Sequence, residues 1–161
     1  MEVKVMFNKQ SAYCHICSAK IRFRKGESLP PACPACGADL ENPFSETLRD
    51  VISCEHLKGA LGIGTGEMYI TDKRLFWMPR KDEDSGNILV GAITGKNADK
   101  VSVNIPLGEI ERIGDCKKLL RIGITVYTKN GEGFNFYLVN RGKPQILKDF
   151  LAPHVGNIFE S

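Results

Sequence analysis

Two pairs of cysteines near the N-terminus constrain this chain more than any other feature of its sequence. Cys14 and Cys17 form one Cys-x-x-Cys turn, and Cys33 and Cys36 form a second one after fifteen intervening residues. Zn²⁺ binds thiolates in a tetrahedron at about 2.3 Å, and two turns that each supply a close pair of sulfurs match that geometry. The spacing therefore predicts one structural zinc ion held by four cysteines.

Three other interpretations of the four cysteines remain open. Two disulfides require an oxidising compartment, and the N-terminal residues lack the apolar run of a signal peptide. A redox Cys-x-x-Cys leaves the second pair unexplained. A single iron suits the second turn, Cys-Pro-Ala-Cys-Gly, which has a rubredoxin-type form, whereas the first turn continues with Ser18 and lacks that glycine. His15 lies between two ligands, and we expect it at the surface or behind the sulfurs, because four thiolates complete the tetrahedron.

The segment between the two turns predicts a strand and a turn. Residues 20–24 alternate polar and apolar side chains, and Pro30 and Pro31 prevent a helix afterwards. We expect residues 1–13 to form an extended lead-in. The order of turn, strand and turn over residues 13–40 resembles a zinc ribbon. That resemblance implies a fold and not a function, because zinc ribbons serve nucleic-acid binding, protein docking and structural stapling.

Length and composition predict two domains, residues 1–42 and residues 43–161. The first is too short to bury enough apolar surface to fold alone, so the metal would supply much of its stability. The formal charge of the 161-residue chain is +3, and it falls to about +1 when one zinc ion is bound by four thiolates. A charge this small argues against a dedicated nucleic-acid-binding protein.

Residues 43–161 read as mostly β. Thr71 to Arg74 form a polar turn between two apolar segments, and Asn130-Gly131 is a strong two-residue hairpin signal. The glycine-rich residues 62–66 lack a following helix for a phosphate, so they predict a flexible turn. Residues 45–50 predict a single helical turn. Pro144 begins an amphipathic C-terminal helix that we expect to break near Pro153 and resume over Val155, Ile158 and Phe159.

Two segments of the second domain resemble GRAM and bacterial PH-like domains. They are Gly66 to Phe76, which is similar to a signature hairpin, and Ile105 to Ile113, which is similar to an "IPL-x-x-I-x-x-I" segment. The resemblance covers residues 46–155. It implies a PH-like β-barrel closed by a C-terminal helix. The fold class expected for the whole chain is therefore α+β and mostly β, with a small four-Cys zinc ribbon before the barrel. It also implies a module that binds phosphoinositides, other lipids or proteins.

Three sets of residues are candidates for binding. Basic residues around the first hairpin would contact a lipid headgroup or a partner, and these are Lys73, Arg74, Arg80 and Lys81. Leu89 and Ile93, in a glycine-rich apolar stretch, would dip into a membrane interface, dock on a partner or pack in the core. Basic residues of the ribbon strand would contact nucleic acid or simply form a solvated strand face, and these are Lys20, Arg22, Arg24 and Lys25.

The sequence predicts a non-enzymatic adaptor that contacts a protein or a membrane-lipid surface. His56 and His154 have no Ser or Cys partner in a catalytic motif. The alternatives are a nucleic-acid-associated zinc-ribbon protein and an electron carrier with iron in the thiolate site. No apolar stretch is long enough for a transmembrane helix, and Cys54 and Cys116 read as reduced core or near-core residues. We therefore expect a cytoplasmic location, either free or peripheral to a membrane.

Overall fold

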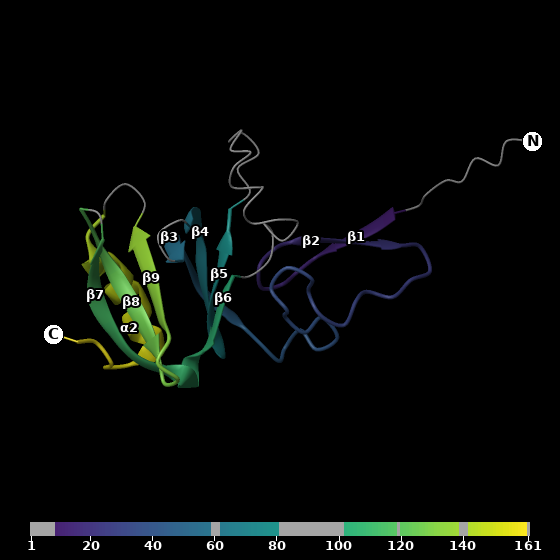
Figure 1. Cartoon of the computed structure of the whole chain (residues 1–161). Helices are drawn as coiled ribbons and strands as arrows, with labels where there is room; N and C mark the ends of the chain where they lie inside the picture. Colours follow the sequence, from purple (N-terminus) through teal and green to yellow (C-terminus); the bar gives the residue numbers. More distant parts are fainter. Residues whose placement is uncertain (1–8, 59–61, 81–101, 119, 139–141, 161) are drawn as a thin grey trace, which may run out of the picture. The chain divides into compact units, whose positions relative to one another are not determined.

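The structure is a computed structural model that describes residues 9–58, 62–80, 102–118, 120–138 and 142–160 (Figure 1). The chain divides into two compact units, Met1–Thr47 and Leu48–Ser161. The sequence placed its boundary between residues 42 and 43. Each unit has its own elements and its own buried residues.

The first unit holds a two-stranded sheet. Strand β1 (Lys9–Tyr13) pairs antiparallel with β2 (Lys20–Arg24), and Tyr13 lies opposite Lys20. The expected lead-in therefore ends in a paired strand. Few apolar side chains are buried here besides the cysteines, chiefly Ile16, Ile21 and Ala38. A core this small is typical of domains that need a bound metal to fold.

The second unit is built on a seven-stranded antiparallel sheet with the order β6-β5-β4-β3-β9-β8-β7. Its strands are β3 (Leu48–Lys58), β4 (Gly62–Thr71), β5 (Arg74–Pro79), β6 (Val103–Pro106), β7 (Ile110–Lys118), β8 (Arg121–Thr128) and β9 (Gly133–Leu138). The hairpins predicted at Thr71–Arg74 and at Asn130-Gly131 are confirmed as β4–β5 and β8–β9.

The sheet is not closed into a barrel, which corrects the expected PH-like barrel. Strands β6 and β7 follow each other in the chain, yet they form the two opposite edges of the sheet. Strand β6 is only four residues long and ends at Pro106, which has no amide hydrogen to donate to a ladder. A short 3₁₀ helix, η2 (Leu107–Glu109), then turns the chain into β7.

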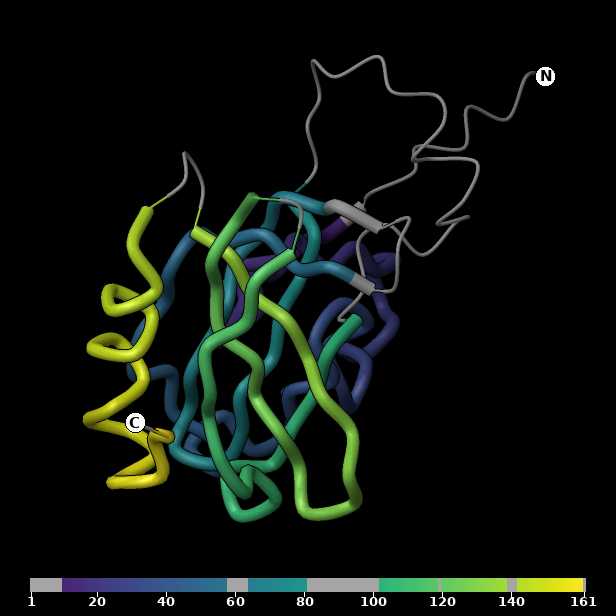
Figure 2. The backbone as a smooth tube through the Cα atoms, turned by 60° about the vertical axis from the view of Figure 1, so that its left-hand side comes forward, coloured from purple at the N-terminus to yellow at the C-terminus, as the bar shows by residue number. Residues whose placement is uncertain are grey.

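One hydrophobic core lies inside the bent sheet. It takes inward-facing side chains from both halves of the sheet, among them Met68, Leu75, Ile124 and Phe136. Helix α2 (Pro144–Val155) packs against β7, β8 and β9 and buries Leu147 and Leu151 in the same core (Figure 2). The prediction of one C-terminal helix starting at Pro144 is confirmed.

Three local expectations were wrong. Residues 45–50 form no helical turn, because β3 already begins at Leu48. The glycine-rich residues 62–66 belong to β4 and not to a flexible turn. Helix α2 runs through Pro153 without a break and ends at Val155, and Ile158 and Phe159 are extended residues after it.

Candidate metal centre and binding surfaces

The two cysteine turns have the same backbone hydrogen bonds. The amides of Cys14 and Cys33 donate to the carbonyls of Ala19 and Ala38, five residues later. The carbonyls of the same two cysteines accept from the amides of Ser18 and Gly37. The two cysteine turns therefore share one backbone geometry, and this geometry places the two thiols of each pair on the same side of their turn.

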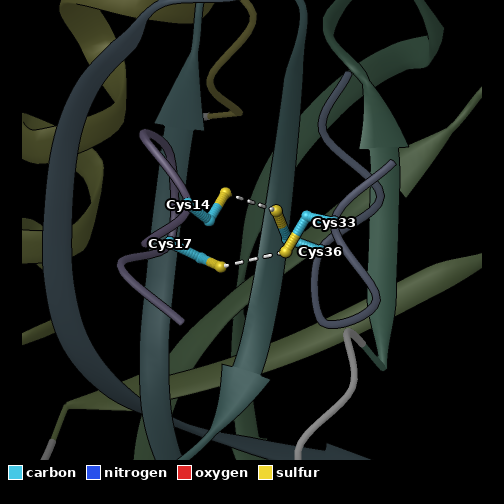
Figure 3. A group of neighbouring side chains, drawn as sticks. All are labelled: Cys14, Cys17, Cys33 and Cys36. Atoms are coloured by element: carbon cyan, nitrogen blue, oxygen red, sulfur yellow. Dashed lines mark hydrogen bonds between the residues drawn. The ribbon is translucent and has the colours of Figure 1, made fainter. Parts of the chain in front are cut away.

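The four sulfurs form a compact group (Figure 3). The Sγ atoms of Cys14 and Cys36 are 3.7 Å apart, those of Cys17 and Cys33 are 3.8 Å apart, and all four lie within 4.8 Å of one another. A tetrahedron with metal–sulfur bonds of about 2.3 Å has sulfur–sulfur edges of about 3.8 Å. A disulfide would bring two sulfurs to about 2.05 Å, and all four cysteines are free. The donor set is therefore compatible with a metal ion such as zinc.

The protonation of the four thiols favours a cation at their centre. Burial raises the pKa of Cys14 to about 11. A hydrogen bond with Cys36 raises the pKa of Cys17, and the same hydrogen bond lowers that of Cys36 to about 5. A divalent ion at the centre of the group would offset the raised pKa values of Cys14 and Cys17 and favour their thiolates.

The first turn reaches the geometry of the second without a glycine. Ser18 has a φ of 61°, and Gly37, at the same position of the second turn, has a φ of 77°. The first turn lacks the glycine of the second in sequence, yet the backbone of the two turns has the same conformation at this position. His15 is exposed, as expected for a residue that is not a ligand.

The β1–β2 sheet has one basic face with an aromatic ring on it. Lys20, Arg22 and Arg24 are exposed on alternate residues of β2, and Lys25 follows in the turn. Tyr13, which is 67% exposed, pairs with Lys20 across the strands and lies on the same face. Phe23 points to the other side. Sequence reasoning missed Tyr13, because only the strand register places it beside the cations.

The predicted cluster of cations in the second unit is not gathered at one place. Lys73 and Arg74 lie at the β4–β5 turn, whereas Arg80 follows the far end of β5, about 20 Å away at about 3.3 Å per residue. The guanidinium of Arg74 lies 4.5 Å from the ring centre of Phe76. Lys81, Leu89 and Ile93 lie outside the described residues.

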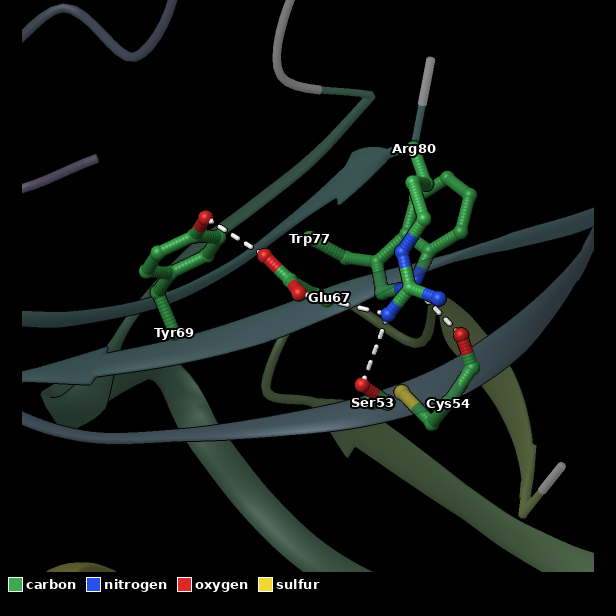
Figure 4. Close-up of polar contacts among 6 residues, drawn as sticks. All are labelled: Ser53, Cys54, Glu67, Tyr69, Trp77 and Arg80. Atoms are coloured by element: carbon green, nitrogen blue, oxygen red, sulfur yellow. Dashed lines mark hydrogen bonds and ion pairs between the residues drawn. The ribbon is translucent and has the colours of Figure 1, made fainter. Parts of the chain in front are cut away.

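Arg80 belongs to a polar network on the outer face of the sheet (Figure 4). It donates to Ser53 Oγ at 2.8 Å and pairs with Glu67 at 3.3 Å, and the hydroxyl of Tyr69 donates to the same carboxylate at 2.9 Å. On the opposite face, the indole of Trp77 donates to the carbonyl of Cys54 at 3.2 Å. These contacts join β3, β4 and β5, so Arg80 has a structural role.

The two histidines of the second unit make contacts that hold parts of the fold together. His56 is buried among the rings of Trp77 and Phe136, and its Nδ1 lies 3.0 Å from the carbonyl of Asn135. His154, on α2, lies 3.8 Å from a carboxylate oxygen of Asp50. Cys54 is fully buried and Cys116 half-buried, and both are free thiols as predicted.

Comparisons with known proteins leave the family unassigned. No protein-family model and no curated protein matches the sequence. The C-terminal domain of an unknown protein from Leishmania infantum matches at 18% identity, over 70% of this chain and 88% of that one, with a TM-score of 0.47. The hSac2 domain of the human phosphoinositide phosphatase Sac2 matches at 12% identity, over 71% and 74%, with a TM-score of 0.43. At these TM-scores neither similarity supports an argument about function, and the resemblance to GRAM and PH-like domains stays a prediction. Within the described residues, no helix has the length and apolar character needed to cross a bilayer.

Proposed function

We propose that this chain is a non-enzymatic adaptor in which a zinc-stapled ribbon is joined to a PH/GRAM-like β-module that contacts a protein or membrane-lipid surface. The observation that carries the proposal is that charged side chains of the second unit form ion pairs between its structural elements. In the described residues they join strand to strand or helix to sheet: Arg80 with Glu67, Arg121 with Glu55, and Lys148 with Asp115. Groups committed in this way hold a scaffold together, whereas a catalytic site needs a nucleophile and a base near an open space.

Zinc is the proposed metal, with iron as the competing occupant. Metal analysis of the purified chain should find one zinc per chain and no visible absorption. An iron centre of four thiolates would be coloured. A red protein with one iron per chain would therefore favour the alternative function, an electron carrier.

Binding of the full chain to vesicles tests the contact surface. We expect co-sedimentation with vesicles that contain anionic lipid, weakened at least tenfold by Leu89→Asp together with Ile93→Asp. Lys73→Glu with Arg74→Glu tests the hairpin turn in the same assay. Unchanged vesicle binding in folded variants would remove both regions from the contact, and no vesicle binding by the wild type would leave a protein partner as the ligand.

A second candidate function, nucleic-acid binding by the ribbon, is favoured by Tyr13 on the basic face. Single-stranded nucleic acid is bound by cations that follow its backbone and by exposed rings on which its bases stack. Lys20 and Arg22 lie beside Tyr13 on this face, and the described residues contain no ion pair that neutralises Lys20, Arg22 or Arg24.

Fluorescence anisotropy with a labelled single-stranded oligonucleotide tests this second function. We expect an affinity that falls steeply with salt, a loss of at least tenfold on Arg22→Glu with Arg24→Glu, and a smaller loss on Tyr13→Ala. Arg49→Glu, at an exposed position of the other unit, is the charge-matched control. An affinity that does not depend on salt, or that survives the reversal of both arginines, would contradict nucleic-acid binding.

A further inference from the structure

The C-terminal residues after α2 lie along the free edge of β7. Ile113 and Phe159 form a parallel bridge. The amide of Ile113 donates to the carbonyl of Ile158 at 3.0 Å, and the amide of Glu160 donates to the carbonyl of Ile113 at 2.9 Å. Residues 156–160, which we call the tail, thus bridge the edge of the sheet at one residue pair.

The outer face of β7 forms a socket for the carboxylate of Glu160. Arg112 donates to Glu160 at 2.6 Å, and its guanidinium lies 3.7 Å from the ring centre of Tyr127. Gly114, two residues along the strand, leaves the necessary room, because a Cβ there would stand 2.7 Å from the carboxylate. A cation held by a ring and a neighbouring glycine together select an acidic residue at this position.

The inner side of the same edge holds the aromatic ring that precedes this carboxylate. Phe159 is bridged to Ile113, and it packs half-buried against the hydrophobic core. A cavity of about 370 Å³ continues beside it, lined by Gln145, Lys148, Asp149, Ala152, Phe159 and Glu160. The tail therefore leaves space between itself and α2.

Strand β7 extends past Ile113 as far as Lys118, beyond the residues that the described part of the tail contacts. Backbone groups of successive residues in a strand point alternately to its two sides. Since Ile113 directs both its amide and its carbonyl to the tail, Asp115 and Lys117 direct theirs to the same side, where no described residue bonds to them. A longer strand would reach these residues. The exposed Lys117 would favour an acidic residue opposite it, whereas the carboxylate of Asp115, which pairs with Lys148, would favour an uncharged residue at its own position.

We propose that the groove between β7 and α2 is a docking site for an extended peptide of a partner protein, which adds as a parallel strand in place of the tail. The peptide carries an aromatic residue followed directly by an acidic one, and then an acidic residue opposite Lys117. The tail is its internal competitor, because Ile158-Phe159-Glu160 makes the contacts that the partner would make.

The contacts of the tail are few enough for exchange. Within the described residues, its backbone makes two bonds to β7, both to Ile113, and its other bonds, from Gly156 to Ala152 and from Ile158 to Gly156, stay within the C-terminal segment. The Arg112–Glu160 pair is 42% and 49% exposed. Exposed ion pairs of this kind contribute little to stability. A partner strand that also reaches Asp115 and Lys117 would make more backbone hydrogen bonds along the same edge.

Fluorescence anisotropy with the full chain and a labelled peptide of residues 155–161 tests the site. The tail is first weakened in the full chain by Phe159→Ser with Glu160→Ser. We expect this variant to bind the peptide at least tenfold more tightly than the wild type does. A peptide extended by four residues, with an acidic one opposite Lys117, should bind the variant more tightly still.

Charge exchange then tests the socket. Arg112→Glu in the tail-weakened variant should lower the affinity at least tenfold, and a peptide with Lys in place of Glu should recover it, whereas Arg49→Glu should change nothing. Circular dichroism checks that each variant is folded. A folded tail-weakened variant that binds neither peptide, or binding that ignores Arg112→Glu, would overturn the proposal. A wild-type dimer in light scattering that Phe159→Ser abolishes would assign the groove to the tail of a second copy instead.

Discussion

Ser18 and Gly37 occupy one position in two turns of the same design. Both have positive φ, a region that costs a residue with a side chain about 1–2 kcal/mol and that glycine enters freely. A Cβ on Gly37 would meet no atom within 4 Å, so the cost of a substitution there comes from the backbone alone. The first turn thus holds strain that the second one avoids.

Substituting these two residues should change stability in opposite directions. We expect Ser18→Gly to stabilise the metal-bound first unit by up to about 1 kcal/mol, since relief of strain outweighs the entropy of an added glycine. Gly37→Ala should cost about 1–2 kcal/mol. Competition for the metal with a chelator measures both. Equal effects of the two substitutions would contradict the shared geometry.

Because of Cys54, we expect the second unit to lose stability as the pH rises into the alkaline range. Burial raises the pKa of this thiol to about 12, whereas an unfolded cysteine ionises near about pH 8.5. The neutral thiol therefore contributes stability that is fully present below the unfolded pKa and is lost as the pH rises towards the folded one.

Urea unfolding, followed through Trp77, measures this pH dependence. We expect the free energy of unfolding to fall by about 1.4 kcal/mol per pH unit above about pH 9, through this group alone. Cys54→Ala should be less stable than the wild type at neutral pH, and the difference between them should shrink as the pH rises. A difference that stays constant up to pH ~10.5 would show that Cys54 does not carry the effect.

Strand β4 shows how an element can depend on a contact with its neighbour. Gly64 and Gly66 read as a turn in the sequence, yet they lie within β4, where the indole of Trp77 from β5 covers them. A Cβ on Gly66 would stand 2.1 Å from the carbonyl oxygen of Met78 and 2.5 Å from the Trp77 ring. The glycines make space for a large side chain from the adjacent strand.

A methyl group at Gly66 should therefore be costly. We expect Gly66→Ala to destabilise the second unit by about 1–3 kcal/mol, because the indole and the β5 backbone have to move. Gly108→Ala is the matched control, since a Cβ there meets nothing within 4 Å. Thermal unfolding of both variants checks this, and equal midpoints would show that Trp77 does not need the space.

For the whole molecule, each unit depends on a different source of stability. The first has few buried apolar residues and a centre of four thiols, whereas the second has a continuous hydrophobic core. The chain contains a single tryptophan, Trp77, which lies in the second unit and is buried. Its fluorescence therefore reports on the second unit alone.

Removal of the metal should separate the two units. We expect a strong chelator to make four further thiols reactive and to unfold the first unit, because a small four-thiolate domain depends on its ion. Trp77 emission should stay that of a buried indole. Thiol titration and fluorescence on one sample check both expectations, and a red shift of the emission would show that the second unit also depends on the metal.

The sequence by itself determined the features that depend on short stretches of chain. The spacing within and between two cysteine turns predicts the four-sulfur group, Asn130-Gly131 predicts a hairpin, and Pro144 begins a helix, because each depends on local backbone geometry. Only the tertiary structure decided what depends on distant partners. Strand register places Tyr13 on the basic face, the space that the Trp77 ring needs keeps Gly64 and Gly66 within β4, and β6 and β7 lie at the two opposite edges of the sheet. The tail lies on β7 because Arg112 and Ile113, some forty-eight and forty-five residues earlier than Glu160 and Ile158, hold it there.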